Sequence, residues 1–502
     1  MIRSIRRRAA TAAAIGAMVG GGLMAGAPAG AQTAVACGTV ITVSTTLTTD
    51  VGPCATDGLI IGGSGVTLNL NGHKVFGAPA PGTQGAAAGQ NVGVRFAGVS
   101  RSTVTNGEVS GFAAGVRVDG GAANSVTVIF AHDNIGPSGN GDNGDGIAVW
   151  NSNYDTIQNN RVVHNGPYSG LAVVTGPYNL PTDPAQTATG NRFLNNQVLN
   201  NNVSMCTASS GCVPRDPNTG QPVARVPQGQ QTTASLDEGI RIEGPNATYS
   251  VVDSNVVSGS GNNGIFLMPS CRNAFMPPPA SAGPPCLGDV PNLGTTVTNN
   301  TSDHNGYGRA EGSGINLFAM PGVLQVFPAA QELVSGNTAR SNYTSGIQLF
   351  STCSGDPTDA VETCTTYNNN VVRNTATNNR RDGITLGPQA FRNTVAQNTV
   401  DANGNDGIDL ALATNQGVPI PGTGPTNNII YANHGTGNAV FDGADETPGC
   451  DANVWMANVF VTVNQPCVRG NPAPAATAGT AMATAPAAAG TASQPRGGTA
   501  GI

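Results

Sequence analysis

Carboxylate side chains stand directly before glycine at several widely spaced points of the chain. Asp145 and Glu238 are two of them, and Asp382 and Asp406 are two more. If these glycines mark equivalent positions in stacked repeats, Asp145 and Glu238 lie two strand spacings apart, roughly 9.5 Å, a separation suited to the acid and base of an inverting glycosidase. Asp382 and Asp406 would lie roughly 4.8 Å apart, close enough to share a proton or a cation. The alternative is that an acidic residue before glycine is a turn residue.

The second residue after each of these glycines is the next candidate for chemistry. In four repeats this position holds Arg117, Ala148, Ala172 and Arg241. Two small residues between arginines would make a floor for a chain of sugars. Two positions further on stand Trp150 and Glu243, and an outward aromatic ring there could stack on a sugar face. Packing beneath the long loops that start at this point is the alternative explanation.

Oxygen and imidazole donors suggest two kinds of metal or proton chemistry. Asp142, Asn143 and Asp145 could bind Ca²⁺ through oxygen, although their spacing is not that of an EF-hand and a polar turn explains them as well. His132 and His164 end similar segments about one repeat apart, which would suit a general base or a pair of copper ligands. Their alternative is a polar residue in an Asn/Ser-rich bend. The candidate catalytic residues are therefore Asp145, Glu238, Arg241 and His164, with Ca²⁺ as a candidate cofactor.

A repeat must position these side chains. The pattern Gly-apolar-x-apolar begins at residues 93, 115, 146, 170, 239, 264, 314, 346, 383 and 407, and most copies precede two more Val/Ile-rich segments separated by Asn. Three short strands per repeat predict a β-solenoid of about a dozen coils. Period-two alternation should stack Ile147, Leu171 and Ile240 in the interior. Asn at the bends tolerates a left-handed backbone and can bond the Asn of the next coil, as pairs such as Asn195-Asn196 suggest.

At this level the chain resembles a known superfamily. The opening Val66–His73 and the closing Cys450–Cys467 resemble the end coils of secreted right-handed parallel β-helix proteins, the architecture of pectate lyases, polygalacturonases and the copper-site accessory proteins of nitrous-oxide reductase. The resemblance implies an all-β, single-stranded right-handed parallel β-helix. It also implies binding or processing of an extracellular polysaccharide on the outside of the sheet built from the Gly-apolar-x-apolar strands.

The resemblance favours some reactions on a polysaccharide over others. Asn143–Ile147 resembles the Asn-Thr-Asp-Gly-Ile segment of polygalacturonases, but Tyr168-Ser169-Gly170 replaces their paired aspartates, and their Gly-His-Gly and Arg-Ile-Lys segments are not found. A lyase or an epimerase is therefore preferred over a hydrolase. A non-catalytic extracellular surface or adhesion protein and a copper-site accessory protein remain as alternatives, and whether the chain is an enzyme stays open.

Composition excludes several classes of protein, and the N-terminal residues predict export. Of 502 residues only 10% are charged, 69 are Gly, and the formal net charge is −7. These values exclude a coiled coil, a basic nucleic-acid binder and a membrane-embedded bundle. Arg3, Arg6, Arg7 and Arg8 precede an apolar stretch and Ala29-Gly30-Ala31, so residues 1–31 are predicted to be a signal peptide. Residues 32–470 should form the β-helix, and the Ala/Pro/Thr-rich residues 471–502 should be disordered.

The 10 cysteines support export. An even number in an exported chain favours disulfides over free buried thiols. They fall into sequence-local pairs: Cys37–Cys54, Cys206–Cys212, Cys271–Cys286, Cys353–Cys364 and Cys450–Cys467. We expect a secreted monomer whose partner is a polysaccharide, with no membrane span and no nucleic acid bound.

Overall fold

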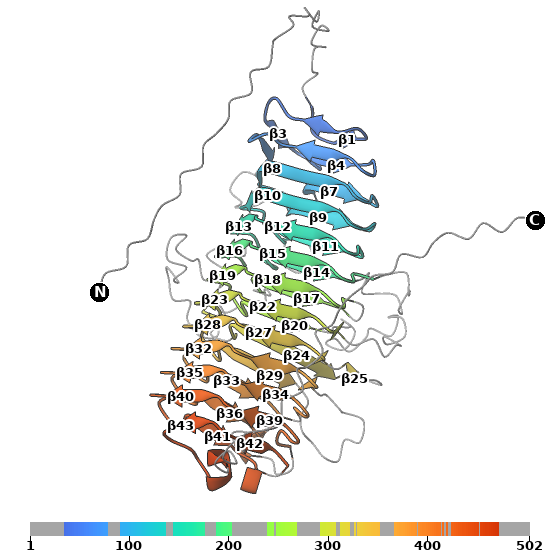
Figure 1. The fold of residues 1–502 in the computed structure, drawn as a ribbon. Coiled ribbons are helices and arrows are strands. Elements are labelled where there is room, and N and C mark those ends of the chain that lie inside the picture. Colours follow the sequence, from blue (N-terminus) through green and yellow to red (C-terminus); the bar gives the residue numbers. More distant parts are fainter. Residues whose placement is uncertain are drawn as a thin grey trace, which may run out of the picture. The chain divides into compact units, whose positions relative to one another are not determined.

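The computed structural model describes residues 35–78, 91–136, 144–175, 187–202, 238–244, 247–268, 292–307, 312–321, 326–327, 329–351, 366–388, 390–412, 414–415, 418–419, 423–450 and 452–470. The Gly-apolar-x-apolar segments form one parallel sheet, sheet A, whose strands follow chain order (Figure 1). This sheet consists of β1 (Thr39–Ile41), β4 (Leu59–Ile61), β7 (Val92–Ala97), β9 (Ala114–Asp119), β11 (Ile147–Trp150), β14 (Leu171–Val174), β17 (Ile240–Glu243), β20 (Ile265–Met268), β24 (Ile315–Pro321), β29 (Ile347–Ser351), β33 (Ile384–Leu386), β36 (Ile408–Leu410) and β41 (Gly443–Asp445), with β25 (Val326–Phe327) antiparallel to β24.

The register of sheet A confirms the predicted stacking. Ile147 pairs with Leu171, and Leu171 pairs with Ile240, and none of the three is exposed to solvent. Complete burial of such a side chain contributes about 1.5–3 kcal/mol relative to leaving it exposed. Glycine precedes these strands because the next coil passes too close for a side chain: a Cβ on Gly146 would lie 2.8 Å from the carbonyl oxygen of Gly170.

The remaining two strands of each coil form sheet B, which is also parallel from coil to coil. In chain order its strands are β2 (Thr45–Thr46), β3 (Val51–Cys54), β5 (Thr67–Asn69), β6 (Lys74–Gly77), β8 (Thr103–Ser110), β10 (Ser125–His132), β12 (Thr156–Gln158), β13 (Arg161–Val163), β15 (Arg192–Leu194), β16 (Gln197–Leu199), β18 (Val251–Asp253), β19 (Val256–Ser258), β22 (Thr296–Thr298), β23 (Thr301–Asp303), β27 (Leu333–Ser335), β28 (Thr338–Arg340), β31 (Asn370–Val372), β32 (Thr375–Thr377), β34 (Thr394–Ala396), β35 (Thr399–Asp401), β39 (Ile429–Tyr431), β40 (His434–Thr436), β42 (Val454–Met456) and β43 (Val459–Phe460).

Short elements complete the described structure. They are β21 (Asn292–Leu293), β26 (Ala329–Ala330) and β30 (Thr366–Tyr367) in one small sheet, β37 (Thr414–Asn415) with β38 (Val418–Pro419), and the 3₁₀ turns η2 (Pro448–Cys450) and η3 (Pro466–Arg469). The described chain is thus all-β, as predicted, and the order of its strands is consistent with three short strands per coil. No apolar helix of membrane-spanning length occurs in the parts of the chain that the structure describes.

Buried asparagines join neighbouring coils at the bends. In the pair Asn195-Asn196 the first residue adopts a left-handed backbone (φ 53°), and the second is 1% exposed. The Asn196 amide nitrogen Nδ2 donates to Oδ1 of Asn255 at 2.9 Å, and Asn255 donates in the same way to Asn300. The chain of bonds continues through Asn337, Asn374, Asn398, Asn433 and Asn458. These ladders satisfy backbone and side-chain groups that the bends bury, which confirms the expected role of Asn.

Two acidic residues interrupt one such ladder. Glu332 donates its backbone N–H to Oδ1 of Asn369, and Asp155 does the same to Asn191. Neither residue is exposed to solvent. Burial raises the pKa of Glu332 well above its ordinary value and raises the pKa of Asp155 to about 6. At these two positions of the ladder a carboxyl group replaces the neutral side chain that the other positions carry.

Replacing Glu332 with glutamine is expected to stabilise the fold at pH 7.5, within the usual range for a single substitution of about 0.5–3 kcal/mol. Because the pKa of Glu332 is raised by folding, the folded state binds more protons than the unfolded state, and Glu332 destabilises the fold as the pH rises above its unfolded value. The gain from Glu332→Gln should therefore shrink as the pH falls towards about 4.5. Urea unfolding of both proteins at pH 7.5 and pH 4.5 measures this difference. An equal gain at both pH values would contradict a protonation effect.

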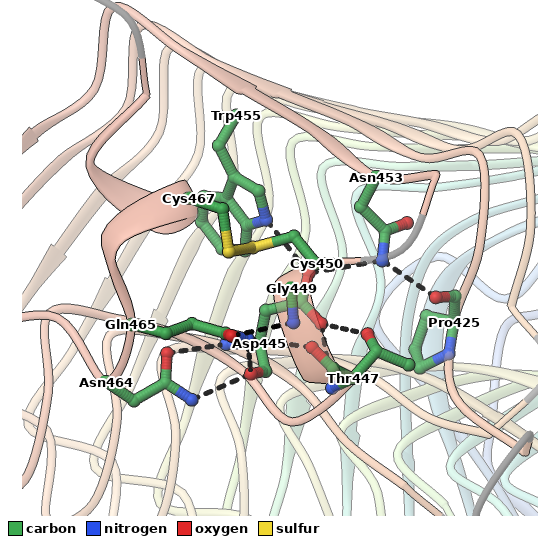
Figure 2. The surroundings of a disulfide bond; sticks show 10 residues. All are labelled: Pro425, Asp445, Thr447, Gly449, Cys450, Asn453, Trp455, Asn464, Gln465 and Cys467. Carbon is green, nitrogen blue, oxygen red and sulfur yellow. Dashed lines mark hydrogen bonds between the residues drawn. A yellow bond between two sulfur atoms is a disulfide. The ribbon is translucent and has the colours of Figure 1, made fainter.

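Disulfides close both end coils. Cys37–Cys54 and Cys450–Cys467 are formed as predicted, whereas Cys206–Cys212, Cys271–Cys286 and Cys353–Cys364 lie outside the described residues. Figure 2 shows the last coil, in which Asp445 accepts hydrogen bonds from Nε1 of Trp455 at 3.0 Å and from Nδ2 of Asn453 at 3.1 Å. The disulfide and the Asp445 carboxylate together hold η2, β42 and η3 against the end of sheet A.

Candidate functional site

The predicted outward column exists on sheet A. Arg95 pairs with Arg117, Arg117 with Ala148, Ala148 with Ala172, and Ala172 with Arg241. These residues alternate with the buried apolar residues of the same strands, so their side chains point away from the interior. Parallel pairing sets them about 4.8 Å apart, which places β7 to β17 under one continuous face.

A polar strip begins this face. The Arg95 guanidinium lies 3.1 Å from Asp57 and 3.7 Å from Asp119. Asp119 also accepts two hydrogen bonds from Arg117, at 2.7 and 3.1 Å. Cζ of Arg117 lies 5.2 Å from the centre of the Trp150 ring. We call Asp57, Arg95, Asp119, Arg117 and Trp150 the polar strip. Its ion pairs hold flat donor and acceptor groups in fixed positions and are partly exposed, which suits hydroxyl-rich ligands.

An apolar floor follows the polar strip. Ala148, Ala172 and Val174 are buried and pack with one another and with Trp150. Nε1 of Trp150 is buried and has no hydrogen-bond partner in the described part of the chain. Trp150 therefore joins the polar strip to the apolar floor. Its Nε1–H has no acceptor among the described residues.

Three buried charged residues form an ion cluster beyond the floor. A terminal nitrogen of Arg241 lies 2.9 Å from Oε2 of Glu243, and the other lies 3.8 Å from Oδ1 of Asp145. The same Asp145 oxygen accepts the backbone N–H of Ser169 at 2.7 Å. Cζ of Arg241 stands 5.7 Å from the centre of the Tyr168 ring. The structure thus brings together Asp145, Arg241 and Glu243. Asp145 precedes the other two residues by 95 positions or more in the sequence.

Glu238 belongs to the same face. It directly precedes Gly239 and β17, two strands of sheet A after the position of Asp145, as the repeat predicts. Glu238 is 3% exposed, and its Oε1 accepts hydrogen bonds from Asn262 at 3.3 Å and Asn263 at 3.4 Å. The distance between the two carboxylates stays a prediction.

His164 lies in a different cluster. Its Nδ1 is 3.7 Å from Asp133, whose other oxygen is 2.7 Å from Nδ1 of His132, and Nε2 of His132 lies 3.1 Å from Glu108. Burial opposes protonation of His132, but the hydrogen bonds with Asp133 and Glu108 raise its pKa. Glu108 also binds Lys74 at 2.7 Å. The structure therefore places His164 in a charged ladder along sheet B, apart from the ion cluster on sheet A.

The predicted Ca²⁺ ligands are only partly described. Asp142 and Asn143 lie outside the described residues, and Asp145 is engaged by Ser169 and Arg241. A Ca²⁺ site at these three residues stays a prediction.

Aromatic side chains continue the outer face beyond the ion cluster. The rings of Phe266 and Phe318 have centres 5.6 Å apart, and those of Phe318 and Phe350 are 5.9 Å apart. Phe266 and Phe318 are 8% and 9% exposed, so these two aromatics are packed rather than open to solvent.

An acidic cluster lies further along the same face. One carboxylate oxygen from each of Asp382, Asp406 and Asp409 lies within 4.8 Å of the others, and all three residues are buried. Burial, and then the charge of Asp382, raises the pKa of Asp406 to about 6 and the pKa of Asp409 well above its ordinary value. The repeat predicted the proximity of Asp382 and Asp406. It missed their grouping with Asp409, although Asp409 stands in the outward column at a position where the other copies of the pattern have Arg, Ala, Phe, Asn, Gln or Thr.

Comparisons with known proteins address the fold. Residues 57–222 match the family model for a right handed beta helix region. A search of curated proteins finds no match. Among solved structures, the Dettilon tailspike protein has a TM-score of 0.45 and 15% identity, and the aligned region covers 84% of this chain and 58% of the tailspike. The chain thus spans little more than half the length of that protein.

Two epimerases are also among the solved structures that match. The periplasmic alginate epimerase AlgG has a TM-score of 0.44 and 11% identity, with 84% of this chain and 78% of that protein covered. The A-module of the Azotobacter vinelandii mannuronan C-5 epimerase AlgE4 has a TM-score of 0.38 and 12% identity, with 86% and 87% covered. The match to the family model over residues 57–222 and the coil-by-coil register of sheets A and B show that the described chain folds as a right-handed parallel β-helix.

Proposed function

We propose that this chain is a secreted, monomeric β-helix protein that binds an extracellular polysaccharide along the outer face of sheet A and processes it at the ion cluster. The polar strip is the observation that carries the binding proposal. It sets two guanidinium groups, two carboxylates and one indole ring in a continuous row that is partly exposed. Sugars offer the matching features, since hydroxyl groups pair with planar ionic groups and the C–H faces of the rings pack on indole.

The geometry of the row also suits an extended ligand. Successive positions are one strand spacing, about 4.8 Å, apart, so a chain of sugars can contact several coils at once. The two arginines and two aspartates of the polar strip balance in charge, and the strip therefore accepts neutral and acidic sugars alike. The formed disulfides support export to an oxidising compartment.

For the processing step we propose proton abstraction, as in a lyase or an epimerase, over hydrolysis. Asp145 accepts a backbone N–H and faces the Arg241 guanidinium, which makes it the candidate base, and Glu238 accepts two amide N–H groups. Hydrolysis by two carboxyl groups needs one of them protonated. A carboxylate base needs no such proton, and Arg241 can stabilise the negative charge that appears on the substrate when a proton is removed.

Replacing Trp150 with alanine is expected to weaken polysaccharide binding by about 10- to 30-fold, because the indole ring of the row is lost. Calorimetric titration of the purified full chain with a panel of uronic-acid polymers and neutral glucans identifies the ligand and measures this loss. Tyr249→Ala is the matched control, since Tyr249 is 59% exposed and stands next to β18 in sheet B.

The same panel separates the competing functions. Ultraviolet absorbance of unsaturated products reports a lyase, and proton NMR of the uronate residues reports an epimerase. Binding without product would support a non-catalytic surface protein and contradict the processing proposal. Absence of binding to every polymer, or equal binding by Trp150→Ala and Tyr249→Ala, would contradict the binding proposal.

A further inference from the structure

The acidic cluster has no role in the polysaccharide proposal. Asp382 directly precedes Gly383 and β33, Asp406 directly precedes Gly407 and β36, and Asp409 lies inside β36. The cluster therefore spans two neighbouring coils. Nδ2 of Asn405 bridges Asp382 at 2.7 Å and Asp406 at 3.0 Å, and the Thr385 hydroxyl donates to Asp382 at 3.0 Å. These donors fix the orientation of the first two carboxylates.

Asp409 supplies an independent observation. Its side chain occupies the outward column of sheet A, in register with Thr385, and it is only 7% exposed. Its Oδ1 is buried and has no hydrogen-bond partner within the described ranges, although an oxygen of Asp409 lies within 4.8 Å of oxygens of both Asp382 and Asp406. A buried carboxylate oxygen without a donor is costly, unlike the bonded oxygens of the other two residues. Asp409 therefore adds a buried, unsatisfied acceptor to the cluster of three carboxylates.

Nearby charges do not neutralise the cluster. Arg381 and Glu446 both act electrostatically on Asp409, and both are exposed at the surface. Among the described residues, three carboxylates and one guanidinium thus act on Asp409. Burying like charges at this separation is unfavourable unless protons or a cation reduce the repulsion.

We propose that Asp382, Asp406 and Asp409 bind one calcium ion. Oxygen donors alone select a hard cation, and Ca²⁺ holds its ligands at 2.3–2.6 Å, so that ligand oxygens on opposite sides stand up to about 5 Å apart. The three oxygens lie within 4.8 Å of one another, which is compatible with such a shell. Mg²⁺ retains several waters, which suits a buried set of protein oxygens less well. The ion would join the coil of β33 to the coil of β36.

The proposal is tested on the purified full chain after EDTA treatment, without any polysaccharide, so it can fail independently of the proposed function. Addition of 1 mM CaCl₂ is expected to raise the thermal midpoint by about 3–6 °C. Asp409→Asn should lose this response. In EDTA the same variant should be at least as stable as the wild type, because it removes a buried negative charge. The wild type should thus be the more stable protein in Ca²⁺ but not in EDTA.

The matched control is Asp401→Asn, the same chemical change at the end of β35, where Asp401 faces His434. It should keep the full response to Ca²⁺. If Asp409→Asn does not fold, Asp406→Asn provides the same comparison. Calorimetric titration with CaCl₂ should show one site fewer in the variant than in the wild type. An unchanged midpoint in Ca²⁺, an equal response to Mg²⁺, or a full response in Asp409→Asn and Asp406→Asn would overturn the proposal.

Discussion

Replacing Asn374 with alanine is expected to lower the free energy of unfolding by about 3 kcal/mol, the largest loss of stability that we expect from any one of these substitutions. Asn374 is 1% exposed and stands in the middle of a ladder of buried asparagines. Its Oδ1 accepts the backbone N–H and the Nδ2 of Asn337, at 2.9 and 3.0 Å. Its Nδ2 donates to the Val334 carbonyl at 2.9 Å and to Asn398 at 3.1 Å.

Alanine removes all four bonds and leaves their partners buried. Each unsatisfied buried donor or acceptor costs about 1–3 kcal/mol, and partial relaxation keeps the total below the sum. Asn370→Ala is the control, because Asn370 belongs to the same coil and its side chain is exposed. It should change stability by less than about 0.5 kcal/mol. Urea unfolding followed by circular dichroism compares the two variants, and similar midpoints would show that the ladder does not hold the coils together.

The sequence was sufficient to predict the fold because each feature recurs once per coil. Glycine before β11 and β14 is required where the next coil passes closely, and the apolar residues after it alternate with a period of two. Asn pairs mark bends in the same way. A repeat pattern does not reveal the single residues that depart from it, and Glu332 is one of them. Its position in a buried ladder could not be predicted from the residue type, since Glu normally favours the surface.

The candidate site could be predicted only as far as register determines it. Register placed Asp145 and Arg241 on one face, because both positions are defined relative to the strand-leading glycines. It could not give the pairing of Arg117 with Asp119, since both side chains come from the same strand and meet through their rotamers. It also could not separate His164 from the ion cluster, because the direction of a side chain at a bend depends on the local backbone, and His164 has a left-handed backbone (φ 56°).

Replacing Arg241 with alanine is expected to lower kcat/KM on the polymer identified in the binding panel by about 100- to 1,000-fold, if the polymer is processed as proposed. Arg241 contacts Asp145 and Glu243, so its loss removes a guanidinium that can stabilise negative charge developing on the substrate beside the proposed base. The control is Arg340→Ala, because Arg340 also pairs with a carboxylate, that of Asp303, but on sheet B. It should leave kcat/KM unchanged.

Loss of Arg241 also removes a positive charge from beside two buried carboxylates, so stability must be measured beside activity. Arg241→Lys separates the two effects: lysine keeps the charge and much of the stability, but it lacks the planar fork that contacts both carboxylates at once. A charge-stabilising role predicts that the folded lysine variant still loses most of its rate. It also predicts a larger kinetic isotope effect with a polymer deuterated at the carbon that loses its proton, because proton abstraction becomes more rate-limiting. A lysine variant with wild-type rate and an unchanged isotope effect would assign Arg241 a purely structural role.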